Sequence, residues 1–380
     1  MVIWVLVGYS LAFGDDVGGG LLGDPLQYVG LQKLLAPEAD GWLTVPTILF
    51  AVFQGMFCVI TGALVSGAIA DRARFGAWLV FVSLWTVLVY APVAHWVFDV
   101  DREGHSGGWL ANQVGLVDFA GGTVVEICSG ASALALAIVV GSRVGFGKEA
   151  MRPHNLTLVM LGAGLLWFGW FGFNAGSALK ADHTAAVVFV TTLCAGAAGS
   201  IGWLLLERVR DGHATSLGAA SGMVAGLVAI TPSCGAVTPL GALVLGLVAG
   251  VVCGLAVGLK YRWRYDDSLD VVGVHLIGGL VGAFGIGLLA TAAAPSGVDG
   301  LFYGGGVDQL GRQLLGGLVV LTYAFVVSWV LAMIVHKAMG FRIDEEHEGS
   351  GIDSVVHAET AYDLHSTAGT RSGGILSQKR

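Results

Sequence analysis

Residues 118–130, DFAGGTVVEICSG, place a carboxylate before a glycine pair and a second carboxylate, Glu126, eight residues later. An apolar run then continues to Val140. Because a helix rises about 1.5 Å per residue, Glu126 should lie roughly 12 Å deeper than Asp118, near the middle of a hydrocarbon core about 30 Å thick. An ionisable group at that depth by default marks a substrate or proton pathway. The alternative is a carboxylate hydrogen-bonded in the bundle for packing alone.

A second stretch, residues 270–279, repeats this pattern with DVVGVHLIGG. It puts Asp270 at a helix start and His275 five residues inside the apolar run. We therefore expect the function to need Glu126 and His275 buried together in a membrane.

The composition sets the fold class. Of 380 residues, 55% are hydrophobic and only 12% are charged, with a mean hydropathy of +0.77. A soluble domain carries about 25% charged residues, so these values predict an all-α polytopic membrane protein. The five cysteines form no CxxC pair, and we interpret them as small core residues rather than disulfides or metal ligands. We expect no cofactor, no metal and no nucleic-acid partner.

Ten hydrophobic segments follow one another along the chain. They cover approximately residues 1–13, 45–70, 75–98, 118–141, 156–179, 184–206, 215–231, 236–259, 269–292 and 312–336. The first would reach only about 20 Å as a helix, too short to span a bilayer, and it lacks the basic start of a signal peptide. We expect a chain that begins inside a transmembrane helix.

The distribution of Lys and Arg predicts the orientation. Four lie in one set of loops: Lys33, Arg102, Lys180 and Arg312. Twelve lie in the alternate loops and after the last segment: Arg72, Arg74, Arg143, Lys148, Arg152, Arg208, Arg210, Lys260, Arg262, Arg264, Lys337 and Arg342. Because cytoplasmic loops carry the excess of Lys and Arg, the second set and the C-terminus are predicted to be cytoplasmic.

Aromatic residues gather where several segments reach the predicted outer surface. Residues 53–57 read FQGMF, residues 90–98 read YAPVAHWVF, and residues 166–178 read LWFGWFGFNAGSA. Aromatic faces can hold a cation, although an interfacial aromatic belt is common in membrane proteins. For Trp96 alone the belt is the better interpretation; for the whole set beside Asp118, Glu126 and His275 we favour a cation-binding mouth. His95 is interpreted as a packing histidine.

Several long motifs closely resemble the ammonium transporter (Amt/Mep/Rh) family. In chain order they are residues 53–75 (FQGMFCVITGALVSGAIADRARF), 118–126 (DFAGGTVVE), 170–178 (WFGFNAGSA), 270–282 (DVVGVHLIGGLVG) and 342–363 (RIDEEHEGSGIDSVVHAETAYD). The resemblance implies a homotrimer of eleven-helix subunits, each an inverted repeat of five helices plus one. Here about ten segments remain, because the first helix would be absent. It further implies a transmembrane domain over residues 1–336 and an ordered cytosolic segment over 337–363. Residues 364–380 are Ser-, Gly- and Thr-rich, which predicts a disordered tail.

The resemblance also implies roles for individual residues. Phe57 and Phe173 would form a stacked gate, and Glu126 and His275 would occupy the two histidine positions of the family's pore, with Glu in place of the first histidine. The remaining assignments are ammonium recruitment by Ser177, with Asp118 organising the site, a vestibule aromatic at Phe98 or Trp96, and support from Asp270 and Asn174. Phe98 stands where the family usually has tryptophan, and residues 99–106 resemble an insertion.

These parts predict a transporter that recruits ammonium, deprotonates it and conducts ammonia, with the proton relayed through Glu126 and His275. Methylammonium is a possible second substrate, the location is the cell membrane, and a PII-type signal protein is the expected cytosolic partner by resemblance. The alternative is an ammonium sensor that signals through its cytosolic tail, although about forty residues are too few for a signalling domain. A membrane enzyme is disfavoured, because the chain has neither an HExxH motif nor a nucleophile triad.

Overall fold

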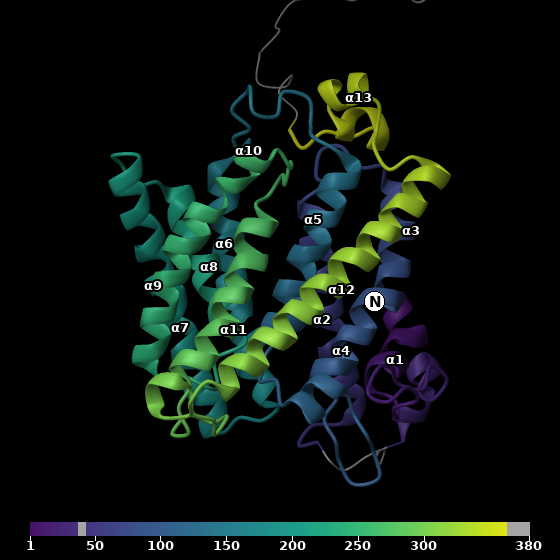
Figure 1. Cartoon of the computed structure of the whole chain (residues 1–380). Coiled ribbons are helices and arrows are strands. Elements are labelled where there is room, and N and C mark those ends of the chain that lie inside the picture. Colours follow the sequence, from purple (N-terminus) through teal and green to yellow (C-terminus); the bar gives the residue numbers. More distant parts are fainter. Residues whose placement is uncertain (37–42, 363–380) are drawn as a thin grey trace, which may run out of the picture.

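A computed structural model describes residues 1–36 and 43–362 of the chain. Within these residues the fold consists of helices and connecting loops, and no strand is present beyond three isolated bridges. Most helices run roughly parallel to one axis, and α12 crosses in front of them diagonally (Figure 1).

The helices follow one another with short connections. They are α1 (Tyr9–Phe13), α2 (Thr47–Gly67), α3 (Phe75–Trp85), α4 (Ala91–Phe98), α5 (Cys128–Val140), α6 (Leu156–Asn174), α7 (His183–Arg210), α8 (Ser216–Ile230), α9 (Pro239–Ala256), α10 (Leu259–Trp263), α11 (Ile277–Leu289), α12 (Asp308–Met339) and α13 (Glu345–Ser350). Wide turns lead into several of them, namely η1 (Trp4–Gly8), η3 (Thr86–Tyr90), η5 (Gly122–Ile127) and η7 (Val272–Leu276).

Eight helical stretches of the described chain are long and apolar enough to cross a membrane. Two shorter apolar helices, Trp4–Phe13 and Ser216–Ile230, accompany them. Together they occupy the ten hydrophobic segments that the sequence predicts, so the all-α polytopic fold is confirmed. The eight long stretches are Thr47–Gly67, Phe75–Phe98, Gly122–Val140, Leu156–Ala178, His183–Arg210, Pro239–Trp263, Val272–Leu289 and Asp308–Met339.

Glycine allows α7, α8 and α9 to pack backbone against backbone. A Cβ added at Gly199 would lie 2.3 Å from the Gly222 carbonyl oxygen, and one at Gly250 would lie 2.2 Å from that of Gly199. Side chains larger than hydrogen would therefore push these helices apart. Small residues serve this purpose in membrane bundles, where lipid tails offer no hydrophobic force to draw helices together.

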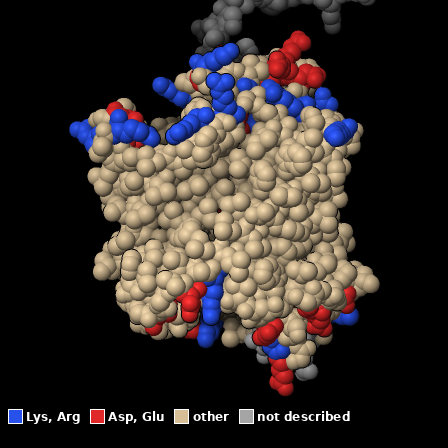
Figure 2. Space-filling view, viewed as in Figure 1, with Lys and Arg blue, Asp and Glu red and all other residues tan. Residues whose placement is uncertain are grey.

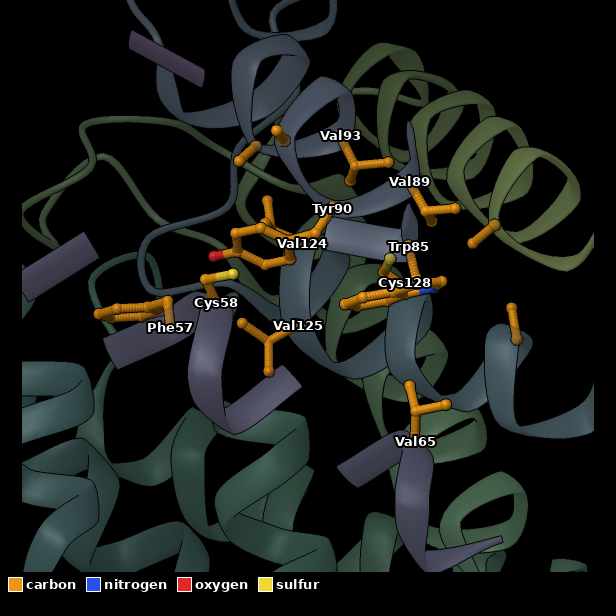
Figure 3. Packing of buried hydrophobic residues seen from close by; sticks show 14 of the residues in the cluster. Phe57, Cys58, Val65, Trp85, Val89, Tyr90, Val93, Val124, Val125 and Cys128 are labelled. Atoms are coloured by element: carbon orange, nitrogen blue, oxygen red, sulfur yellow. The ribbon is translucent and has the colours of Figure 1, made fainter. Parts of the chain in front are cut away.

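On the other side of the molecule, larger side chains fill the space between helices. Phe57, Trp85, Tyr90 and Cys128 belong to one buried cluster between α2, α3 with η3, and α5 (Figure 3). The indole N–H of Trp85 donates to the hydroxyl oxygens of Ser132 on α5 and Ser328 on α12, at 3.0 and 3.1 Å. This polar contact attaches the diagonal helix α12 to the helix that follows Glu126.

Charged side chains gather at the two ends and leave an uncharged band between them on the face shown in Figure 2. We call the end that carries α10 and α13 the basic end. There the fully buried Arg72 donates to the Gly141 carbonyl oxygen and the Ser268 hydroxyl, both at 2.7 Å. Arg143 and Asp266 form a buried ion pair beside it at 2.8 Å. This network ties the loops after α2, α5 and α10 together.

The segment after α12 folds back on the basic end. Phe341 is fully buried, and Glu348 of α13 pairs with Arg342 at 2.7 Å while accepting the Val144 amide at 2.7 Å. The expected ordered segment therefore contacts the loop after α5 as far as residue 362. Residue 363 and the predicted tail at 364–380 lie outside the described residues.

At the opposite end, residues 99–108 are held by charged side chains. His105 contacts Asp15 through Nδ1 at 2.6 Å and Asp99 through Nε2 at 2.8 Å, and Arg102 pairs with Asp99 at 3.1 Å. His95 is fully buried beneath this group, with Nδ1 3.1 Å from the Ala12 carbonyl oxygen, which confirms its interpretation as a packing histidine.

Candidate functional site

Asp118 caps the turn that leads to Glu126. One carboxylate oxygen accepts the amides of Gly121 and Gly122 at 2.7 and 2.8 Å, and the other accepts those of Thr123 and Val124 at 2.7 and 3.3 Å. Four amides at a helix start have no helical partner, and a carboxylate satisfies them while complementing the helix dipole. Asp118 therefore fixes the direction of η5.

The glycine pair that follows has two separate reasons. Gly121 has φ +107°, a left-handed conformation that favours glycine. Gly122 has no room for a side chain, because a Cβ there would lie 2.3 Å from Cδ of Pro232. Both glycines are needed for the chain to turn sharply between the acid and the buried helix.

The second half of the molecule uses the same arrangement, with a different aspartate from the one predicted. Asp267, eight residues before His275, accepts the amide of Val272 at 2.7 Å. Asp270 does precede the helix, but its carboxylate pairs with Lys260 at 2.7 Å. Burial raises the pKa of Asp267 to about 6. Asp118 with Glu126 and Asp267 with His275 are thus equivalent pairs at the same spacing.

The structure brings Glu126 and His275 together. Nδ1 of His275 lies 2.6 Å from Oε2 of Glu126, and the two residues come from η5 and η7. Glu126 is fully buried and His275 is 9% exposed. A contact this short between a carboxyl and an imidazole contains a proton donated by one of them to the other.

Two buried oxygens beside this contact have no hydrogen-bond partner in the described part of the chain. They are Oε1 of Glu126 and the hydroxyl oxygen of Thr123, one turn earlier on η5. Buried polar groups are normally paired, so such atoms are candidates to bind a small polar molecule. The pair thus offers acceptors as well as a transferable proton.

Phenylalanine rings from three elements meet near the end opposite to the basic end. The ring centroids of Phe57 on α2 and Phe173 on α6 are 4.6 Å apart and tilted by 45°. Phe98 at the end of α4 meets Phe57 edge-on at 6.0 Å. We call these three residues the aromatic group.

The structure separates the two candidates for the vestibule aromatic. Phe98 reaches the aromatic group, whereas Trp96 is 6% exposed and turned away from it. The Trp96 ring lies 4.6 Å from that of Tyr323 on α12, and its N–H donates to the Leu21 carbonyl oxygen at 2.8 Å.

Ser177 and Asn174 continue from the aromatic group. Ser177 is half-buried, and its hydroxyl donates to the Phe173 carbonyl oxygen at 2.8 Å, which leaves its lone pairs to accept. Asn174 is fully buried, with its amide nitrogen donating to the Thr192 hydroxyl at 3.0 Å and its carbonyl oxygen unpartnered in the described chain. Both side chains can accept a hydrogen bond from a cation that rests on the rings.

No group of three or more His, Cys, Asp or Glu side chains among the described residues could hold a metal ion. The five cysteines are free. The titratable groups of the site are therefore those of one carboxylate and one imidazole.

Comparison with known proteins identifies this arrangement. The model of the Ammonium Transporter Family matches residues 1–362. The chain belongs to the ammonium transporter family. Membership confirms the resemblance predicted from the motifs, and it places the chain among transporters rather than enzymes.

Members of the family with curated names support the assignment. The chain is 55% identical over 390 residues to an ammonium transporter of Mycobacterium tuberculosis, covering 97% of this chain and 82% of that protein. It is 46% identical over 368 residues to an ammonium transporter of Corynebacterium glutamicum, covering 96% and 80%.

Solved structures of the family share the fold. Saccharomyces cerevisiae Mep2 superposes with a TM-score of 0.80 at 36% identity, covering 91% of this chain and 77% of that one. A structure titled a sensor Amt protein superposes with a TM-score of 0.81 at 29% identity, covering 93% and 85%.

Proposed function

We propose that this chain transports ammonium across a membrane by separating it into ammonia and a proton. The observation that carries the mechanism is the 2.6 Å contact between buried Glu126 and His275, which adjoins two unpartnered oxygens. Membership of the ammonium transporter family supports ammonium as the substrate. The curated relatives cited above carry the transporter name, so we propose transport rather than sensing.

Recruitment is assigned to the aromatic group and its neighbours. Ammonium would rest against the Phe98 face, because an aromatic ring attracts a cation through its quadrupole. The Ser177 hydroxyl would accept one of its four N–H bonds, while Asp118 acts indirectly by holding the turn next to Phe57. Phe57 and Phe173 would then form the gate through which only a desolvated molecule passes.

Deprotonation is assigned to the step past the gate. A bare cation in an apolar passage costs far more than a neutral molecule, so ammonia crosses and its proton takes a separate route. Glu126 would receive the proton on Oε1 while His275 releases one from its other nitrogen, because the two groups titrate as one coupled pair. Potassium can neither donate hydrogen bonds nor lose a proton, and it would be rejected.

Ammonium jumps applied to proteoliposomes test this proposal. We expect a transient current on exposure to ammonium and none on exposure to potassium at the same ionic strength. A potassium current as large as the ammonium current would overturn it, because selection would then not depend on a removable proton.

The surroundings of the site suggest further assignments. We infer that the basic end and the C-terminus face the cytoplasm of a cell membrane and that residues 1–336 form the transmembrane domain, by the excess of Lys and Arg. Only 6% of the apolar window of Leu156–Ala178 is buried within one chain, which supports a homotrimer in which another subunit covers it. Cross-linking in membranes tests the trimer. A PII-type partner at the basic end follows from the family resemblance, and co-purification with such a protein tests it.

A further inference from the structure

A cavity of about 510 Å³ lies at the basic end, separate from the Glu126–His275 contact. It opens between α5, α10 and the start of α11, and its volume is typical of small-molecule sites. Its deeper wall is formed by Leu134 and Ile138 of α5, Leu259 of α10, and Leu276 and Ile277. These aliphatic side chains fit a hydrocarbon chain.

The rim of the cavity has a different chemistry. Arg264 lines it, is exposed, and has no ion pair in the described part of the chain. By contrast, Arg143 nearby is bound by Asp266. No Asp or Glu is among the lining residues, so an anion at the rim would meet a cation without a competing carboxylate. Trp263 also lines the rim and is 66% exposed.

The position of the rim decides between possible occupants. Trp263 ends the membrane stretch Pro239–Trp263, and Gly141 at the rim directly follows α5. The rim therefore lies where helices leave the hydrocarbon core, at the end where Lys and Arg gather in Figure 2. Tryptophan is enriched at that depth, and basic pockets between helices there receive anionic lipid headgroups. A soluble anion would use the arginine and leave the apolar wall without a function.

We propose that this cavity binds one anionic phospholipid of the adjacent leaflet, with its phosphate at Arg264 and an acyl chain along the wall between α5 and α11. Leu276, in the wall, directly follows His275, and a Cβ at Gly130 would lie 2.5 Å from Cβ of Leu276. The lipid chain would therefore support the spacing between the helices that carry Glu126 and His275. This consequence rests on the proposed function, whereas lipid binding itself does not.

Quenching of Trp263 fluorescence tests the site without any transport measurement. The whole protein is placed in phosphatidylcholine nanodiscs that contain a small fraction of acyl-brominated phosphatidylglycerol or acyl-brominated phosphatidylcholine. The Trp263 signal is obtained by subtracting the emission of Trp263→Phe. At equal mole fraction we expect brominated phosphatidylglycerol to quench this signal about fivefold more effectively, the preference that one basic residue near a membrane surface provides.

Two variants and a control locate the binding. Arg264→Asn should remove the preference, and Asn tolerates the φ of +57° found there. Ile138→Phe, at a half-exposed position of the wall, should reduce the excess quenching by filling the cavity. Arg152→Asn removes the same charge from an exposed position of the basic end outside the cavity, and should change nothing.

Three results would overturn the proposal. One is equal quenching by the two brominated lipids, and another is an equal loss in Arg264→Asn and Arg152→Asn. The third is loss of the excess quenching on adding inorganic phosphate but not potassium chloride of the same ionic strength, because the site would then bind a soluble anion.

Discussion

Asp118 shows how a single side chain sets the geometry of the site. Its two oxygens accept four backbone amides of the turn that precedes Glu126. An amide in its place has one accepting oxygen and no charge, so amides would be left unpaired in a buried turn.

We therefore predict that Asp118→Asn lowers the free energy of unfolding by at least about 2 kcal/mol, since hydrogen bonds to charged groups contribute about 1.5–3 kcal/mol each. The midpoint of thermal unfolding in one detergent measures this effect. Asp353→Asn, at an exposed position after α13, is the control. Equal midpoints for the two variants would show that the cap does not hold the turn.

Phe98 permits a direct test of recruitment. Tryptophan binds cations better than phenylalanine does, by about 0.5–1 kcal/mol at accessible sites. Phe98→Trp should therefore lower the ammonium concentration for half-maximal current about two- to fivefold. Trp96→Phe should leave this concentration unchanged, because Trp96 faces Tyr323. The assignment fails if Trp96→Phe shifts it and Phe98→Trp does not.

At this scale the sequence predicted part of the site. Glu126 and His275 were found because charge inside an apolar run is rare and costly. The choice between Trp96 and Phe98 was left open, although residues two apart on a helix point to different sides and only one could reach Phe57. Asp267 was missed because three aspartates precede the helix, and only the folded loop shows which one turns toward its amides.

At the scale of elements, residues 99–108 and the loop after α1 are joined by His105. Burial by itself lowers the pKa of His105, but hydrogen bonds with Asp99 and Asp15 outweigh it and raise the pKa above its ordinary value. The hydrogen bond with His105 in turn holds the pKa of Asp15 below its ordinary value. Asp16 and Arg102 also face this group.

This raised pKa gives stability a defined pH dependence. A protonated His105 stabilises the fold fully below the unfolded-state pKa of about 6.5, and this stabilisation is lost as pH rises through the higher folded-state value. We predict that the unfolding midpoint falls between about pH 6 and about pH 9, and that His105→Gln reduces the fall. His154→Gln, at an exposed position, is the control. A fall of the same size in wild type and His105→Gln would contradict the assignment.

The helices themselves were largely predictable. Long apolar runs have few alternatives in a chain with 12% charge, so all ten segments were located. The wide turns η5 and η7, which carry Glu126 and His275, were not predicted, because hydrophobic periodicity does not distinguish them from regular helix. The order of residues 340–362 was expected only from the family resemblance, since this segment reads as a solvated acidic surface.

At the scale of the whole molecule, the excess of Lys and Arg at one end is the observation that predicts orientation. Cysteine labelling in intact cells tests it. Glu103→Cys, opposite to the basic end, should react with a membrane-impermeant maleimide. Glu149→Cys, at the basic end, should react only after permeabilisation. The two substitutions remove the same charge and leave the count of Lys and Arg unchanged. Labelling of Glu149→Cys alone in intact cells would reverse the proposed orientation.

The central claim is that Glu126 and His275 together transfer the proton removed from ammonium. Glutamine at position 126 keeps the shape of the side chain but cannot titrate, so the ammonium-evoked current of proteoliposomes containing Glu126→Gln should fall at least about tenfold, at the low end of what a positioned proton-transfer group contributes. Glu149→Gln makes the same chemical change at an exposed position and should leave the current intact. An unchanged current in folded Glu126→Gln would contradict the account.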